Sequence, residues 1–147
     1  MTDIMPGPGL LQVAALCWRR VHIVEVLLVT SLRTRRWIIP KGWPHKRRTL
    51  PNSAATEAAE EAGVFGEISK APIGHFQYLK ERKWGVAHPC RVDVYSLRVS
   101  LEQDDWPEKD RRERIWLPPA EAASRIAEPE LRHLILTFLE SQRRPGR

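Results

Sequence analysis

The sequence lacks most of the features that mark a secreted, membrane or zinc-binding protein. Its 147 residues include only two cysteines, Cys17 and Cys90, without metal-ligand spacing, so we expect reduced, buried thiols and no zinc site. No apolar run approaches the roughly 18 residues of a membrane-spanning helix, and the start, MTDIMPGPG, has no basic segment of a secretory signal. No internal repeat or linker divides the chain. We therefore predict a single domain over residues 1–147, in the cytoplasm and without a membrane partner, with flexible ends at residues 1–8 and 143–147.

Acidic residues are too few to balance the basic ones, and the net charge is +6. The excess is clustered in three groups: Arg33, Arg35 and Arg36; Lys41, His45, Lys46, Arg47 and Arg48; and Lys80, Arg82 and Lys83. Such groups attract polyanions, so they favour a small phosphorylated molecule or nucleic acid as the partner. A solvated basic surface without a ligand is the plain alternative.

Three glutamates are spaced to share one face of a helix. Glu57, Glu60 and Glu61 stand at offsets of zero, three and four. Like charges at this spacing repel each other, and a hard divalent cation such as Mg²⁺ relieves the repulsion. A solvated glutamate face is the alternative on the spacing alone. The two basic groups that flank these glutamates favour a metal site that faces phosphate.

The ends of this helix are also marked in the sequence. Thr49 is a suitable N-cap, and Gly63 is suited to the left-handed conformation that follows a helix. These signals predict a helix over about residues 50–62. The turn at residues 40–42, Pro-Lys-Gly, precedes it and permits the backbone to approach a ligand closely.

Residues 42–64 resemble the signature of the Nudix hydrolases, usually written G-x5-E-x7-R-E-U-x-E-E-x-G-U, where U is aliphatic. The matching positions are Gly42, Glu57, Ala58, Glu60, Glu61, Gly63 and Val64. The flanking segments 37–44 and 74–80 are similar to the branch related to the diphosphoinositol polyphosphate phosphohydrolases. This resemblance covers most of the chain. It implies an α/β/α sandwich with a mixed β-sheet and the hydrolysis of phosphoanhydride bonds.

The resemblance also implies roles for individual residues. A divalent cation, Mg²⁺ or Mn²⁺ in its place, would screen the attacking water from phosphate charge and neutralise the leaving group. The predicted metal ligands are Gly42, through its backbone carbonyl, Glu57, Glu60 and Glu61. The predicted substrate-binding residues are Arg36, Lys41, Arg48 and Lys80. The predicted catalytic residues are Glu57, Glu60, Glu61 and Glu113.

Two positions depart from the signature. Arg48 stands where the signature has its first glutamate, and Thr56 stands where it has its arginine. One hypothesis is that Arg48 turns outward and binds substrate phosphate, which leaves a hydrolase that works with fewer metal ions. The other is a catalytically weak or inactive Nudix fold that binds a polyanion.

The general base is open between several carboxylates. Glu57 on the helix and Glu113, just ahead of the strand predicted at residues 115–117, are the main candidates, and Glu108 and Asp110 are further ones. For Glu113 the plain alternative is an ion pair with one of the arginines at positions 111, 112 and 114.

The remaining patterns predict an α/β fold. Apolar and β-branched runs predict strands at residues 10–18, 24–30, 37–39, 73–79, 91–99 and 115–117, with the first two paired. Apolar spacing predicts C-terminal helices at residues 120–126 and 130–142. The expected product is a mixed sheet with helices on its faces.

We therefore predict an Mg²⁺-dependent pyrophosphohydrolase that cleaves a diphosphate linkage in a nucleoside- or inositol-linked polyphosphate. If the substrate is a nucleotide, Trp43, Tyr78 or Trp84 would stack on its base. RNA is the less favoured partner, and the sequence leaves open whether the protein is a monomer or a homodimer.

Overall fold

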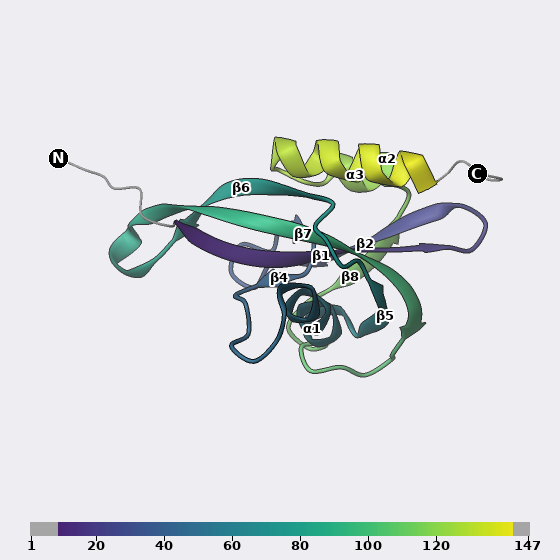
Figure 1. Cartoon of the computed structure of the whole chain (residues 1–147), viewed down its shortest axis with the longest axis horizontal. Coiled ribbons are helices and arrows are strands. Elements are labelled where there is room, and N and C mark those ends of the chain that lie inside the picture. Colours follow the sequence, from purple (N-terminus) through teal and green to yellow (C-terminus); the bar gives the residue numbers. More distant parts are fainter. Residues whose placement is uncertain (1–8, 143–147) are drawn as a thin grey trace.

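A mixed β-sheet of eight strands forms the middle of three layers in the computed structural model, with helices on both faces (Figure 1). The structure describes residues 9–142, apart from the side chain of Lys83, so the predictions about the two ends of the chain lie outside it. The strands are β1 (Leu10–Arg20), β2 (Val24–Thr30), β3 (Trp37–Ile38), β4 (Lys41–Gly42), β5 (Val64–Ile68), β6 (Gly74–Glu81), β7 (Ala87–Glu102) and β8 (Arg114–Leu117). The helices are α1 (Leu50–Ala62), α2 (Pro119–Ser124) and α3 (Pro129–Gln142), with a short 3₁₀ turn η1 (Lys83–Gly85).

The sheet is mixed because its two central strands run parallel. The order is β3-β2-β1-β7-β5, with β4 beside β1, β6 beside β7 and β8 beside β2. Strands β1 and β7 pair in parallel, with Val13 opposite Asp93, and the other pairs are antiparallel. The predicted pairing of the first two strands and the predicted α/β sandwich are both confirmed.

The central strand β1 is apolar on both faces, and this alternation supplies two cores. Ala14, Leu16 and Trp18 lie in the core under α2 and α3, whereas Val13 and Cys17 lie in the core under α1. Helix α1 contributes three buried alanines to its core, at positions 54, 58 and 62, and Leu50 packs against this core. Because alanine is small, α1 packs closely on the sheet. This packing places Glu57 against Gly42, the last residue of β4.

Helix α1 begins and ends where the sequence predicts. The Thr49 hydroxyl accepts a hydrogen bond from the Asn52 backbone N–H at 3.2 Å. Gly63 has φ of 68° and donates its N–H to the Ala59 carbonyl at 3.1 Å. These two caps fix the position of the three glutamates relative to the sheet.

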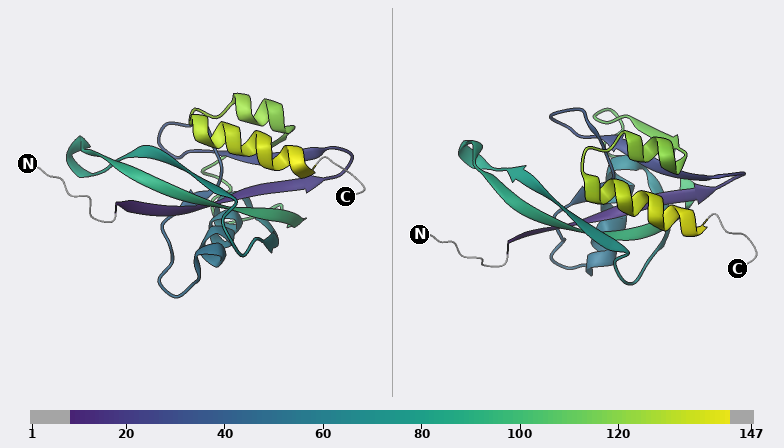
Figure 2. Two further views of the ribbon diagram at one scale, coloured as in Figure 1. Left: turned by 45° about the horizontal axis from the view of Figure 1, so that its top comes forward. Right: turned by 90° about the horizontal axis from the view of Figure 1, so that it is seen from above.

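Some elements differ from the sequence prediction. Strand β5 was not expected, because the segment Val64–Ile68 has a central glycine and exposes its middle three residues. Lys41–Gly42 was expected as a turn and forms the two-residue strand β4 against β1. Strands β6 and β7 form a long hairpin that extends beyond the rest of the sheet (Figure 2). Over the described residues, no helix is long and apolar enough to span a membrane.

Candidate active site

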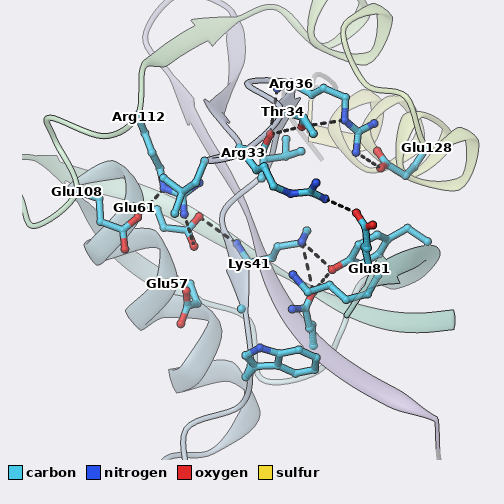
Figure 3. Close-up of a pocket in the computed structure, with 18 of the residues that line it drawn as sticks. Arg33, Thr34, Arg36, Lys41, Glu57, Glu61, Glu81, Glu108, Arg112 and Glu128 are labelled. Atoms are coloured by element: carbon cyan, nitrogen blue, oxygen red, sulfur yellow. Dashed lines mark hydrogen bonds and ion pairs between the residues drawn. The ribbon is translucent and has the colours of Figure 1, made fainter. Parts of the chain in front are cut away.

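A cavity of about 630 Å³ opens where α1, the β2–β3 loop, β6 and the segment before β8 meet (Figure 3). Five acidic and five basic side chains lie in its wall: Glu57, Glu61, Glu81, Glu108 and Glu128; Arg33, Arg36, Lys41, Lys80 and Arg112. Gly42, Trp43 and Tyr78 lie in the wall as well. The cavity thus gathers two of the predicted glutamates, the predicted glycine and three of the four predicted substrate-binding residues.

Glu61 is the most buried acidic group of the site. Only 3% of the residue is exposed, and its Oε1 accepts a hydrogen bond from the Lys41 backbone N–H at 3.3 Å. Burial raises the pKa of Glu61 to about 9, against the opposing effect of Arg112, and Glu57 raises it further. Glu57 and Glu61 stand one turn apart on α1, close enough for their like charges to repel each other. A free anionic pair is therefore unfavourable here without a proton or a cation.

Arg112, in the segment before β8, pairs with Glu61 on α1. Its Nη2 lies 3.5 Å from Glu61 Oε2, its Nε donates to Glu108 Oε1 at 2.6 Å, and its Nη1 donates to the Thr30 carbonyl at 2.9 Å. The guanidinium is buried, so these contacts are weakly screened. Arg112 consequently fixes both carboxylates in the wall of the cavity.

The segment that carries Glu108 wraps around the C-terminus of α1. Trp106 donates its indole N–H to the Glu61 carbonyl at 3.1 Å, and Arg114 donates to the Ala62 carbonyl at 2.6 Å. A Cβ on Gly63 would stand 2.8 Å from the Trp106 ring. Glycine is therefore required at position 63 both for its left-handed backbone and for this packing.

Gly42 lies directly against the Glu57 carboxylate. A Cβ built on Gly42 would stand 2.5 Å from both Cδ and Oε1 of Glu57, which is shorter than a van der Waals contact. His45 holds the same carboxylate from the other side, with Nε2 2.9 Å from Glu57 Oε2. The His45 backbone N–H donates to the buried Ser53 hydroxyl at 2.9 Å, which anchors the loop that carries the ring.

The donor set of this wall suits a hard divalent cation. It consists of oxygen atoms, and the Glu57 and Glu61 carboxyl groups lie in one partly buried wall, where their mutual repulsion favours a cation. Glu60, the third predicted ligand, does not line the cavity. Within residues 9–142, no three acidic, histidine or cysteine side chains converge into one ligand set. The geometry thus brings together two of the three predicted carboxylate ligands.

The opposite wall is cationic, and its arginines are paired with acids. Arg33 lies 2.9 Å from Glu81, and Arg36 lies 3.7 Å from Glu128. These pairs link the β2–β3 loop to β6 and to the α2–α3 connection. Lys41 is held differently, because its Nζ donates to the Tyr78 hydroxyl at 3.0 Å and to Gln12 Oε1 at 3.3 Å. Burial lowers the pKa of Lys41 to about 8, and repulsion from Lys80 lowers it further.

Besides Glu60, two more predicted residues lie outside the cavity wall. The Glu113 side chain is 71% exposed and pairs with Arg35 at 3.5 Å, so the ion-pair alternative is realised with a different arginine from those expected. Arg48 is exposed and donates to the Thr56 hydroxyl at 3.0 Å. The two departures from the signature therefore contact each other on the outer surface of α1.

Sequence reasoning missed several residues of the cavity. Gln12 and Arg112 were not assigned to the site, and Glu108 was only a minor candidate for the base. Gln12 stands alone in an apolar strand, where a buried amide is a signal for a specific partner. Arg112 gives no such signal, because it lies in a run of charged residues that reads as a solvated loop.

Comparison with known proteins identifies Nudix hydrolases among the relatives of this chain. No protein-family model matches the chain. Nudix hydrolase 12, mitochondrial, from Arabidopsis thaliana is 34% identical over 105 residues, which are 69% of this chain and 52% of that protein. Diphosphoinositol polyphosphate phosphohydrolase 3-beta from Bos taurus is 34% identical over 114 residues, 76% of this chain and 65% of that protein. The chain spans about half of the first relative and just under two thirds of the second.

The solved structures agree on the fold. A MutT protein from Methanosarcina mazei Go1 superimposes with a TM-score of 0.68 at 18% identity, covering 96% of this chain and 100% of that one. This structural similarity shows the fold, and the sequence similarity to named Nudix hydrolases shows the family. The chain belongs to the Nudix hydrolase family.

Proposed function

We propose that this chain is a pyrophosphohydrolase that cleaves a diphosphate linkage in a nucleoside- or inositol-linked polyphosphate by attack of water at phosphorus. One observation carries the proposal: the Glu57 and Glu61 carboxyl groups line the same cavity, and the other wall of that cavity presents basic side chains. Hydrolysis of a phosphoanhydride needs this division, because one wall must hold a cation and the other must hold anionic phosphates.

Glu57 and Glu61 would hold the divalent cation, which we take to be Mg²⁺ or Mn²⁺, together with the Gly42 carbonyl that the family signature implies. When bound, such a cation supplies positive charge to the phosphates and makes water more acidic. Glu60 would contribute only if its side chain reorients toward the cavity, since it lies outside the cavity wall.

The remaining roles are phosphate binding and general-base catalysis. Lys41 and Lys80 would bind phosphate oxygens, and Arg36 would do so on leaving Glu128. We place the general base at Glu57, which lines the cavity beside Gly42, whereas Glu108 is held by a 2.6 Å hydrogen bond from Arg112. Glu113 does not line the cavity and pairs with Arg35, so we do not assign it the role of base.

The test is the release of phosphate from a diphosphoinositol polyphosphate and from a dinucleoside polyphosphate with Mg²⁺. Glu61→Gln should lower kcat by about 100-fold, the scale expected when a metal-holding or positioning group is lost. Glu113→Gln is the matched control, because it makes the same substitution on an exposed acid and should keep the wild-type rate. Equal rates for wild type and Glu61→Gln would refute the proposal, and a loss in Glu113→Gln would refute the assignment of the base.

A second candidate is a module that binds a polyanion without cleaving it. The contact between Arg48 and Thr56 favours it, because the signature's own acidic and basic residues are absent from these positions. The same assay separates the two, since the module would bind the polyphosphate and release no phosphate. For a nucleotide, Trp43 and Tyr78 line the cavity and are placed to stack on a base, whereas Trp84 is 95% exposed on η1 and lies outside the wall.

A further inference from the structure

The basic side chains of the cavity are not equivalent in their partners. Arg33 pairs with Glu81, Arg36 pairs with Glu128, and Arg112 lies between Glu61 and Glu108. Each arginine is thus offset by at least one carboxylate within 4 Å. An anionic ligand gains less from a cation that an acid already neutralises, because the ligand must compete with that acid.

The two lysines of the wall differ from the arginines, because among the described residues neither Lys41 nor Lys80 lies within ion-pair distance of a carboxylate, and Lys41 has a defined set of hydrogen-bond partners. Its ammonium donates to two neutral oxygens, the Tyr78 hydroxyl and the Gln12 side-chain carbonyl, and lies 4.4 Å from the centre of the Tyr78 ring. None of these groups carries a negative charge. Within the described part of the chain, no carboxylate lies within ion-pair distance of this ammonium. The Lys41 ammonium is therefore not paired with a carboxylate and is available to an anionic ligand.

The two neutral partners also hold each other. The Tyr78 hydroxyl donates to Gln12 Oε1 at 2.7 Å, so Gln12 Oε1 accepts from two donors at once. These donors determine which end of the Gln12 amide faces Lys41. Gln12 is buried on β1, Tyr78 comes from β6 and Lys41 from β4, so three separate strands fix the position of one ammonium. A flexible lysine would otherwise lose much rotamer entropy on binding a ligand.

We propose that Gln12 and Tyr78 are positioning residues that hold the Lys41 ammonium in the cavity as an unneutralised cation, where it takes an anionic phosphate oxygen of the ligand. The proposal deepens the proposed function, because it names the group that anchors the polyphosphate. It also explains why β1 carries the buried amide of Gln12, because an amide oxygen orients the ammonium without neutralising its charge.

The test measures binding without catalysis. Inorganic tripolyphosphate is titrated into the protein by calorimetry in the presence of a chelator, so that no divalent metal takes part. Gln12→Glu places a carboxylate against Lys41 and should weaken binding by about tenfold or more, the scale of one lost charge-assisted contact. Tyr78→Phe keeps the ring and removes one hydrogen-bond acceptor, and should weaken binding by about fivefold.

Two controls separate positioning from general effects. Gln77→Glu makes the same change of charge on β6, at an exposed residue outside the cavity wall, and should leave the affinity unchanged. In a Lys41→Met background, Tyr78→Phe should have no further effect on binding, because its influence acts through the ammonium. Thermal unfolding of each variant confirms that the protein is folded at the temperature of the titration.

The outcomes are distinct from those of the hydrolysis assay. Equal weakening by Gln12→Glu and Gln77→Glu would overturn the proposal, because it would show a general effect of charge. A wild-type affinity in both Gln12→Glu and Tyr78→Phe, or a wild type that binds no tripolyphosphate, would overturn it as well. Binding that follows the expected pattern while no substrate is hydrolysed would refute the proposed enzyme activity and leave this assignment standing.

Discussion

Replacing Gly42 by alanine is expected to abolish most activity while leaving the fold intact. The added Cβ would stand 2.5 Å from Cδ and Oε1 of Glu57 and 2.8 Å from Oε2. Since carbon atoms in contact are about 3.5 Å apart, the carboxylate must move by about 1 Å. A displacement of about 1 Å in a positioned group costs on the order of 100-fold in kcat.

The same change should barely alter stability. Gly42 is not among the glycines with positive φ, so alanine adopts its backbone conformation without strain. The clashing atoms are the end of a glutamate side chain, which can swing toward the cavity. We expect the free energy of unfolding to change by less than about 1 kcal/mol. Gly9→Ala is the matched control, because its Cβ would meet nothing closer than the Pro89 carbonyl at 4.0 Å.

The assay combines phosphate release at saturating substrate with thermal unfolding. A double-mutant cycle sharpens it: Glu57→Asp shortens the side chain, so it should cost less in the Gly42→Ala background than in the wild type. Wild-type kcat in Gly42→Ala would show that the position of the Glu57 carboxylate does not matter for catalysis. A large fall in Tm would show instead that the glycine serves the fold.

Three further changes test the groups around this site. The pKa of Glu61 is raised from 4.5 to about 9, so the folded protein keeps a proton that the unfolded chain releases. The protonated Glu61 therefore contributes stability that is full below pH 4.5 and is lost as the pH rises to about 9. Tm of the metal-free protein should therefore fall with rising pH, and less steeply in Glu61→Gln; equal slopes would contradict the raised pKa. Arg112→Met leaves Glu61 and Glu108 without their cation and should cost about 3–5 kcal/mol in chemical denaturation, less in a Glu61→Gln background; a neutral result would show that the pair is not buried in solution. Thr49→Ala removes the N-cap of α1 and should cost about 1 kcal/mol, and no loss would mean that the cap is replaced by water.

The parts of the site that were predicted correctly are those fixed by local rules. Capping by Thr49 and the left-handed Gly63 set the ends of α1, and helical periodicity places Glu57 and Glu61 on one face. The same periodicity places Glu60 there too, but it does not say where the cavity wall ends. A helix face is wider than a binding site, so spacing alone selects one carboxylate too many.

The parts that were missed depend on contacts between distant segments. Tyr78 meets Gln12 across 66 positions, and Arg112 meets Thr30 across 82. No local pattern encodes such a contact, because it depends on the order and register of the strands. The parallel pairing of β1 with β7 is an example, since it brings residues about 80 positions apart together and leaves no mark in either strand's own composition.

The two residues that depart from the family signature lie away from the cavity wall. Arg48 and Thr56 contact each other on the exposed side of α1 and do not line the cavity. Glu57 is instead held by His45, and Glu61 by the Lys41 backbone and Arg112, none of which belongs to the signature's acidic and basic positions. Support for the carboxylates has thus moved to a loop and to the segment before β8. A signature read along the chain registers the two substitutions as losses, whereas the folded site retains a positive partner for its most buried acid.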